Sequence, residues 1–283
     1  MERKNTIVYT PESRIRSPQK LLKDLWEGII NGRELAWRLT VRDISAQYRQ
    51  TALGLLWALI MPLASTITWI FLNGSGIISV GETALPYPVY VLTGTMLWAI
   101  FMDALNAPQQ NTMASKGMLA KINFPREAII LAGIYKVLFN GGIKIGLIII
   151  SLLILGVYPD WRMIFFPLGV LSLILEGTTL GLLLTPIGLL YTDIGRGLSL
   201  AMQFLMYVTP VVFPMPTKGW VALLFKLNPI TSLILTTRDW ITGFTPGFLG
   251  SFLVVNGTML PLLLLVLLIY RLVMPILIER MSA

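Results

Sequence analysis

Six long apolar stretches constrain the fold of this sequence more than any other feature. They lie near residues 51–72, 86–106, 128–157, 163–190, 197–214 and 249–274. A helix needs about 20 apolar residues to cross the hydrocarbon core of a bilayer. Charged residues make up only 13% of the chain, whereas an average soluble domain carries about 25%, so a water-soluble surface could not be covered. The sequence predicts an all-α membrane protein with six transmembrane helices.

The residue types that are missing exclude most enzyme chemistry. The sequence has no cysteine and no histidine, which excludes disulfides, thiol catalysis and imidazole-based acid, base or metal chemistry. It also lacks the G-x-x-x-x-G-K-[ST] phosphate loop, so this chain is not expected to hydrolyse ATP. We therefore expect no catalytic residue, no metal site and no cofactor in this chain.

The positive charge of the chain is concentrated at its beginning. The net charge is +8, and ten of the 22 Lys and Arg residues precede the first apolar stretch. They are mixed with acids and show no glycine-rich or aromatic-stacking pattern, so a cytoplasmic tail is favoured over a nucleic-acid site. No apolar core of a cleaved signal occurs in residues 1–20, and with six spans both termini are expected in the cytoplasm. The expected organisation is therefore a tail with an amphipathic helix over 1–49, a transmembrane domain over 50–274 and a short cytoplasmic tail over 275–283.

Three segments outside the spans also have helical patterns. Residues 18–31 follow Ser17 with an apolar face at helical spacing, which predicts an amphipathic helix in the membrane interface that either anchors the chain or contacts a cytoplasmic partner. Residues 110–122 suit a short cytoplasmic helix, either a plain connection or a docking element. Between the fifth and sixth spans, the pieces 219–227 and 230–237 are too short to cross, and Asn228-Pro229 separates them. They predict two half-depth helices that re-enter from the outer face.

Charged residues inside the predicted spans are candidates for function. Asp103 and Lys136 fall near the expected cytoplasmic ends. Lys144 and Glu176 fall deep in the third and fourth spans, which are consecutive and antiparallel, so we expect an intramembrane pair between them. This pair could serve packing or transport. The pairs Gly142/Gly146 and Gly177/Gly181 have the small-xxx-small spacing that permits close helix contacts.

Aromatic residues are dense in the first, second and fifth spans. Most of those near span ends belong to the usual interfacial belt. Trp57, Trp98 and Tyr207 lie away from it, and their rings would suit the apolar face of a sugar in a pore.

Three stretches in order carry a resemblance to a known family. They are VRDISAQYRQTALGLLWALIMPL at 41–63, YTDIGRGLSLAMQFLMYVTPVVFP at 191–214 and LNPITSLILTTRDWITG at 227–243. They resemble the permease subunits of ABC exporters for O-antigen, teichoic acid and related polysaccharides, a branch of the type-2 ABC permeases. This resemblance covers residues 35–245.

The resemblance implies a homodimer bound by two copies of a separate ABC ATPase, which would hold the ATP and Mg²⁺. A lipid-linked polysaccharide would cross the cytoplasmic (inner) membrane through a conduit at the dimer centre. Residues 18–31 would form the interface helix, 110–122 the coupling helix and 216–243 the re-entrant helices.

The resemblance and the aromatic pattern together name two sets of site residues. The conduit-lining candidates are Trp57, Trp98, Phe204 and Tyr207. The ATPase-coupling candidates are Arg42, Asp43, Arg49, Met113, Lys116, Met118 and Lys121.

Two other functions stay open at this point. One is a type-2 ABC permease for a small lipid or drug, which would need no glycan for ATPase stimulation. The other is an integral-membrane acyl or glycosyl transferase, which the missing histidine and the lack of an acidic donor site disfavour.

Overall fold

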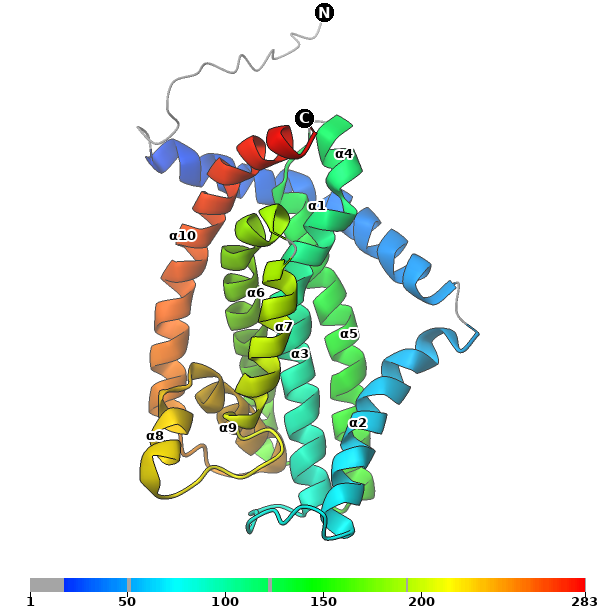
Figure 1. The fold of residues 1–283 in the computed structure, drawn as a ribbon, viewed down its shortest axis with the longest axis vertical. Coiled ribbons are helices and arrows are strands. Elements are labelled where there is room, and N and C mark those ends of the chain that lie inside the picture. Colours follow the sequence, from blue (N-terminus) through cyan, green and yellow to red (C-terminus); the bar gives the residue numbers. More distant parts are fainter. Residues whose placement is uncertain (1–17, 50–51, 122–123, 192, 283) are drawn as a thin grey trace, which may run out of the picture.

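The computed structural model describes residues 18–49, 52–121, 124–191 and 193–282, and every regular element in these ranges is a helix (Figure 1). In chain order they are α1 (Pro18–Arg49), η2 (Gly54–Leu56), α2 (Trp57–Gly74), α3 (Tyr87–Ala114), α4 (Lys116–Lys121), α5 (Glu127–Ile154), η3 (Trp161–Phe165), α6 (Phe166–Leu190), α7 (Asp193–Tyr207), α8 (Gly219–Leu227), α9 (Pro229–Thr242) and α10 (Leu249–Ser282). The helices form a bundle with α1 and α4 at one end and α8 at the other (Figure 1). We refer to these as the α1 end and the α8 end.

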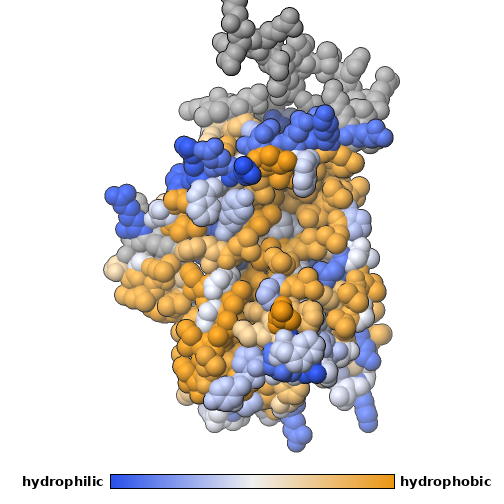
Figure 2. Space-filling model, turned by 180° about the vertical axis from the view of Figure 1, so that it is seen from behind, coloured by the Kyte–Doolittle hydropathy of each residue, from blue (hydrophilic) through white to orange (hydrophobic). Residues whose placement is uncertain are grey.

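Five helical segments of the described chain are long and apolar enough to cross a membrane. They are Gly54–Gly74, Tyr87–Ala114, Glu127–Ile154, Trp161–Leu190 and Leu249–Leu277. Apolar residues cover the middle of the face shown in Figure 2, and hydrophilic residues gather toward the α1 end. This distribution is that of a protein whose middle is solvated by lipid. The prediction of an all-α membrane protein is confirmed.

The other predicted span, 197–214, is helical only in part. Helix α7 ends at Tyr207 after 15 residues, which is about 22 Å at 1.5 Å per residue. Residues 208–213 continue as turns. The predicted re-entrant pieces correspond to α8 and α9, which are bent by 81° at their break. Asn228 caps α9 by accepting a hydrogen bond from the Ile230 amide at 3.1 Å.

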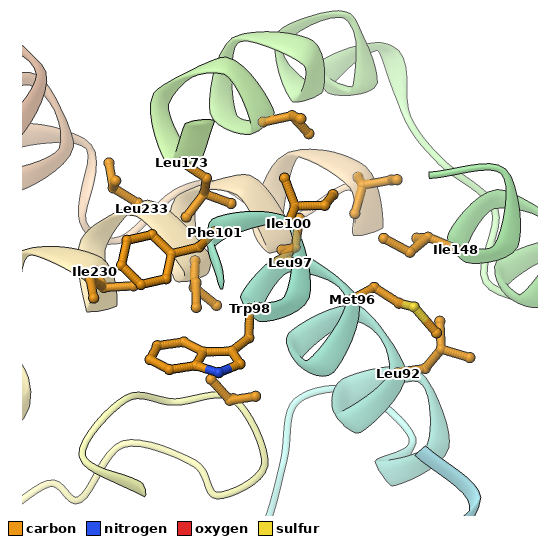
Figure 3. Close-up of a cluster of buried hydrophobic side chains, with 14 of the residues drawn as sticks. Leu92, Met96, Leu97, Trp98, Ile100, Phe101, Ile148, Leu173, Ile230 and Leu233 are labelled. Carbon is orange, nitrogen blue, oxygen red and sulfur yellow. The ribbon is translucent and has the colours of Figure 1, made fainter. Parts of the chain in front are cut away.

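Helix α3 lies at the centre of the bundle. In its most apolar window 78% of the residues are buried, against 6% for α2. Figure 3 shows the core around it, in which Phe101 and Leu97 of α3 lie with Leu173 of α6 and Ile148 of α5. Burial of this apolar surface stabilises one continuous core that includes α9.

Glycines of α6 bring its backbone against that of α3. A Cβ atom on Gly177 would lie 2.7 Å from the carbonyl oxygen of Phe101, and one on Gly181 would overlap the carbonyl oxygen of Leu105. The predicted small-residue contact is therefore confirmed for this pair. Gly142 and Gly146 of α5 instead have open space at the Cβ position.

Helix α1 is much longer than the predicted 18–31 and crosses the end of the bundle (Figure 1). It packs on α5 where Ala36 and Leu39 meet Ala128 and Ala132. Thr40 also donates to the carbonyl oxygen of Ala132 at 3.2 Å. Beside this contact α1 exposes large apolar residues, among them Leu22, Trp26, Ile30 and Trp37.

The predicted short helix over 110–122 is divided in the structure. Residues 110–114 complete α3, Ser115 ends it, and α4 begins at Lys116. The Ser115 amide donates to the carbonyl oxygen of Asn111 at 3.0 Å. The Leu119 amide donates to the carbonyl oxygen of Ser115 at 2.9 Å. The segment is thus a bend at Ser115 followed by a helix of six residues.

A buried arginine holds the chain that follows α7. Arg238 of α9 is 2% exposed. Its guanidinium donates to Thr93 Oγ1 at 3.2 Å and to the Val211 carbonyl oxygen at 3.3 Å, and lies 3.9 Å from the centre of the Tyr90 ring. The Tyr90 hydroxyl in turn donates to the carbonyl oxygen of Pro210 at 3.1 Å. We call these residues the arginine cluster.

Asn228 adds a second contact to the end of α7. Its side-chain amide donates to Thr209 Oγ1 at 2.8 Å and to the Val208 carbonyl oxygen at 3.3 Å. Non-helical backbone at membrane depth needs such partners because lipid offers none. Pro210 has no amide hydrogen to continue the helix, and the long-range bonds stabilise the turns that follow Tyr207.

We expect Gly177→Ala to destabilise the protein because the new methyl would force α3 and α6 apart. The cost of such overpacking is about 1–3 kcal/mol. Gly146→Ala is the matched control, since that position is open and alanine is the better helix former. Thermal unfolding of both purified variants in detergent measures the difference. Equal melting temperatures for the two variants would contradict the close α3–α6 contact.

We expect Arg238→Met to lower the free energy of unfolding by about 2 kcal/mol, because the cation–ring contact and the two hydrogen bonds are lost. Arg238→Lys should not restore it, since a lysine cannot supply the planar fork of donors. Lys226→Met, at an exposed position on α8, is the control. The same thermal assay applies, and wild-type stability of Arg238→Met would show that the arginine cluster does not hold the α7 end.

Candidate functional site

A cavity of about 480 Å³ opens among α2, α3 and α5. Its walls come mostly from the first half of α2 and the middle of α3, with single residues from α1 and α7. The lining is mixed, with aromatic, polar, charged and small side chains. The lining residues are Gln47, Trp57, Ala58, Met61, Pro62, Ser65, Thr95, Trp98, Ala99, Asp103, Asn140, Lys144 and Met206.

Two of the four predicted conduit aromatics line this cavity. Trp57 is at the first turn of α2 and is 43% exposed. Trp98 is mostly buried in α3, where its ring lies 5.4 Å from that of Phe101 (Figure 3). Beside them, a hydrogen bond of 2.9 Å between the hydroxyl groups of Thr66 on α2 and Thr95 on α3 joins the two helices.

The other two conduit candidates, Phe204 and Tyr207, do not line the cavity of this chain. Both are exposed on α7. Tyr207 makes an edge contact with Trp69 of α2, with ring centres 6.4 Å apart. Ser199 and Gln203 are exposed on the same helix, so this surface combines aromatic and polar side chains.

An ion pair lies in the cavity wall. Lys144 Nζ of α5 donates to Asp103 Oδ2 of α3 at 2.5 Å. The lysine side chain is 10% exposed and the aspartate side chain 37%, so the carboxylate is the more accessible group. Asp103 lies near the middle of helix α3, because this helix continues past the predicted span 86–106 to Ala114.

The predicted pair between Lys144 and Glu176 is wrong. Glu176 is 1% exposed in α6, and neither of its carboxyl oxygens has a hydrogen-bond partner. The prediction assumed that consecutive antiparallel spans are neighbours. Helices α5 and α6 both pack against α3 and barely touch each other, so the lysine meets the acid on α3.

The predicted coupling residues lie on α1, α3 and α4. Met113 is 44% exposed and Lys116 is exposed, whereas Met118 packs on the contact of α1 with α5. The side chain of Lys121 lies outside the described residues. In α1, Arg42 pairs with its neighbour Asp43 at 2.7 Å, and Arg49 is exposed in the last turn.

Behind these residues, buried polar contacts join α3, α5 and α10 at the α1 end. Arg271 of α10 pairs with Glu127 of α5 at 2.6 Å. The Tyr270 hydroxyl lies 3.1 Å from Thr112 Oγ1 of α3. Sequence patterning did not indicate these contacts, because Glu127 and Arg271 are 144 residues apart in the sequence and each is typical of a charge at the end of a span.

Comparison with known proteins agrees with this architecture. The ABC-2 type transporter family matches residues 34–240. An O-antigen export system permease protein of Myxococcus xanthus is 22% identical over 218 residues, which cover 76% of this chain and 81% of that protein. One from Klebsiella pneumoniae is 24% identical over 207 residues, 71% and 77% of the two chains. The polysialic acid transport protein KpsM of Escherichia coli is 22% identical over 220 residues, 75% and 82% of the two chains.

The family match covers well over half of the chain, and the helical bundle provides the apolar spans that a membrane protein of this kind requires. The chain belongs to the ABC-2 type transporter family, whose permeases are membrane transport subunits that work with an ABC ATPase.

Proposed function

We propose that this chain is the transmembrane subunit of an ATP-driven exporter that moves polyprenyl-linked polysaccharide of the O-antigen class across the inner membrane. The observation that carries the proposal is the cavity beside α2, in which Trp57 and Trp98 stand with polar and charged groups. Permeases named for O-antigen and polysialic acid transport are among the relatives. The chain itself would bind no nucleotide, and the ATP and Mg²⁺ would be held by the ATPase.

The chemistry of a polysaccharide requires such a lining. Its hydroxyl groups cannot enter hydrocarbon without hydrogen-bond partners, and its ring faces are partly apolar. A path that combines indole faces with hydrogen-bonding groups satisfies both. Weak, repeated contacts of this kind would let a long chain advance without stalling.

A homodimer would complete the conduit. The cavity lies beside α2, of which almost no residue is buried, and the exposed face of α7 carries Ser199 and Gln203 besides Phe204 and Tyr207. Lipid tails offer no hydrogen bonds to such polar side chains. A second copy facing α2 and α7 would enclose them together with the two cavities, and this supports the symmetric arrangement.

Two copies of an ABC ATPase would dock at the α1 end, which would face the cytoplasm together with both termini. The short α4 and the exposed Met113 and Lys116 offer the contact there. Helix α4 follows directly on α3, whose middle lines the cavity. Nucleotide-driven closure of the ATPase could thus move the conduit walls as rigid elements.

Deletion of the gene for this chain in its native host tests the proposal. We expect surface polysaccharide to be lost and lipid-linked polymer to accumulate on the cytoplasmic leaflet, with restoration by the wild-type chain. Affinity purification from the complemented strain should recover an ABC ATPase and the lipid-linked glycan. Normal surface polysaccharide in the deletion strain would contradict the proposal. Recovery of the ATPase with a small lipid or drug as the stimulating substrate would favour the alternative permease.

We expect Trp57→Ala to slow export about fivefold without loss of assembly, because one ring contact of about 1 kcal/mol is removed. Tyr207→Ala should act in the same direction if α7 faces the second copy. The control is Trp220→Ala, since Trp220 is exposed on α8 away from the cavity. The rate at which surface polysaccharide reappears after induction measures the effect. Unchanged export in Trp57→Ala and Tyr207→Ala would contradict the conduit assignment.

We expect Lys116→Glu to reduce the amount of ATPase that co-purifies with the chain by about tenfold, because a charge at a docking surface is reversed. Lys226→Glu, at the α8 end, is the matched control. Quantitative gels of the detergent-purified complex measure the ratio of the subunits. A wild-type ratio in Lys116→Glu would exclude this residue from the docking contact.

A further inference from the structure

Asp103 and Lys144 are the only charged side chains among the described residues that line the cavity. They stand in the same wall as Trp57 and Trp98. The ion pair of Glu127 with Arg271 lies at the α1 end outside the cavity. The position of the Asp103–Lys144 pair therefore needs its own explanation.

Stability does not explain the position of this pair. The lysine side chain is only 10% exposed, and the solvation that it loses is barely returned by its attraction to the aspartate, so apolar replacements of similar volume are often neutral or stabilising. A membrane span offers many apolar alternatives at no such cost. A charged pair retained on a cavity wall is therefore expected to contact what enters the cavity.

The geometry leaves hydrogen-bonding capacity on both groups. A carboxylate offers about four acceptor positions and an ammonium three donors, and their mutual bond uses one of each. The aspartate side chain is 37% exposed, so its remaining acceptors are accessible from the cavity. The pair has no net charge, which suits a ligand that is itself neutral.

We propose that Asp103 and Lys144 form a binding subsite for a neutral pyranose unit of the exported polymer. Asp103 accepts a hydrogen bond from a sugar hydroxyl, Lys144 donates to a neighbouring sugar oxygen, and an indole ring packs on the apolar face of the sugar. The two charges still compensate each other when the sugar leaves. The subsite can therefore release one sugar unit and bind the next unit of the polymer. This inference rests on the proposed function and names the part of the substrate that the cavity recognises.

The double variant D103L/K144M tests the subsite, because it removes both charges together and replaces them with apolar side chains of similar length and branching. We expect it to assemble with its ATPase and to melt at the wild-type temperature or above. Export should nevertheless fall at least fivefold, and stimulation of ATP hydrolysis by the lipid-linked glycan should be lost. Wild-type export by an assembled D103L/K144M complex would overturn the inference and leave the proposed function standing, because the deletion strain tests the latter separately.

A binding measurement supplies a second, independent readout. Saturation-transfer NMR on the purified complex with maltoheptaose, a neutral hexopyranose oligomer, should show contact in the wild type and lose it in D103L/K144M. The variant E127L/R271M removes the ion pair outside the cavity and should retain the signal. If D103L/K144M fails to assemble, D103N/K144Q replaces it, with a reduced signal expected. Equal signals in wild type and variant, or stronger binding of a sialic acid tetramer than of maltoheptaose, would overturn the inference.

Discussion

The backbone contact between α3 and α6 is the constraint on which the rest of the bundle depends. Because Gly177 and Gly181 carry no side chain, the carbonyl oxygens of Phe101 and Leu105 can approach α6 directly. Helix α3 thereby becomes the central helix, and helices that are distant in the chain pack around it (Figure 1). Along its length α3 therefore contributes Tyr90 at the α8 end, Trp98 and Asp103 at the cavity, and Thr112 at the α1 end.

Local features of the sequence predicted the helices well. Apolar length alone located five spans, and the Asn228-Pro229 step located the break between α8 and α9. Both signals act within a few residues: an asparagine side chain satisfies a free amide at a helix start, and a proline there loses no hydrogen bond. Such signals are readable without knowledge of the rest of the fold.

What the sequence could not provide was the order of helices in space. Helix α7 was expected to continue to residue 214, but bonds from Asn228 and Arg238, both on the far side of α8, hold residues 208–211 in turns. Lys144 was paired with Glu176 because their spans are consecutive, whereas α3 lies between them. In the same way the aromatic pattern found Trp57 and Trp98 but could not show that Phe204 and Tyr207 face away from this chain's cavity. The bonds at the α7 end and the partner of Lys144 are contacts between distant residues, and the direction in which Phe204 and Tyr207 face depends on how α7 packs. Periodicity encodes neither.

The two helices that share the Asp103–Lys144 pair are confined to different degrees. On α3, Asp103 stands between residues whose backbone touches α6, so its position is fixed by contact with glycines. On α5, Lys144 stands between Gly142 and Gly146, which have open space beside them. Helix α5 also packs along α3 and α1, and at its Glu127 end an ion pair joins it to Arg271 of α10, which contacts both α4 and Thr112 of α3. The Asp103–Lys144 pair thus joins α3, the most confined helix of the bundle, to α5. A second ion pair of α5, between Glu127 and Arg271, lies near the proposed ATPase contact.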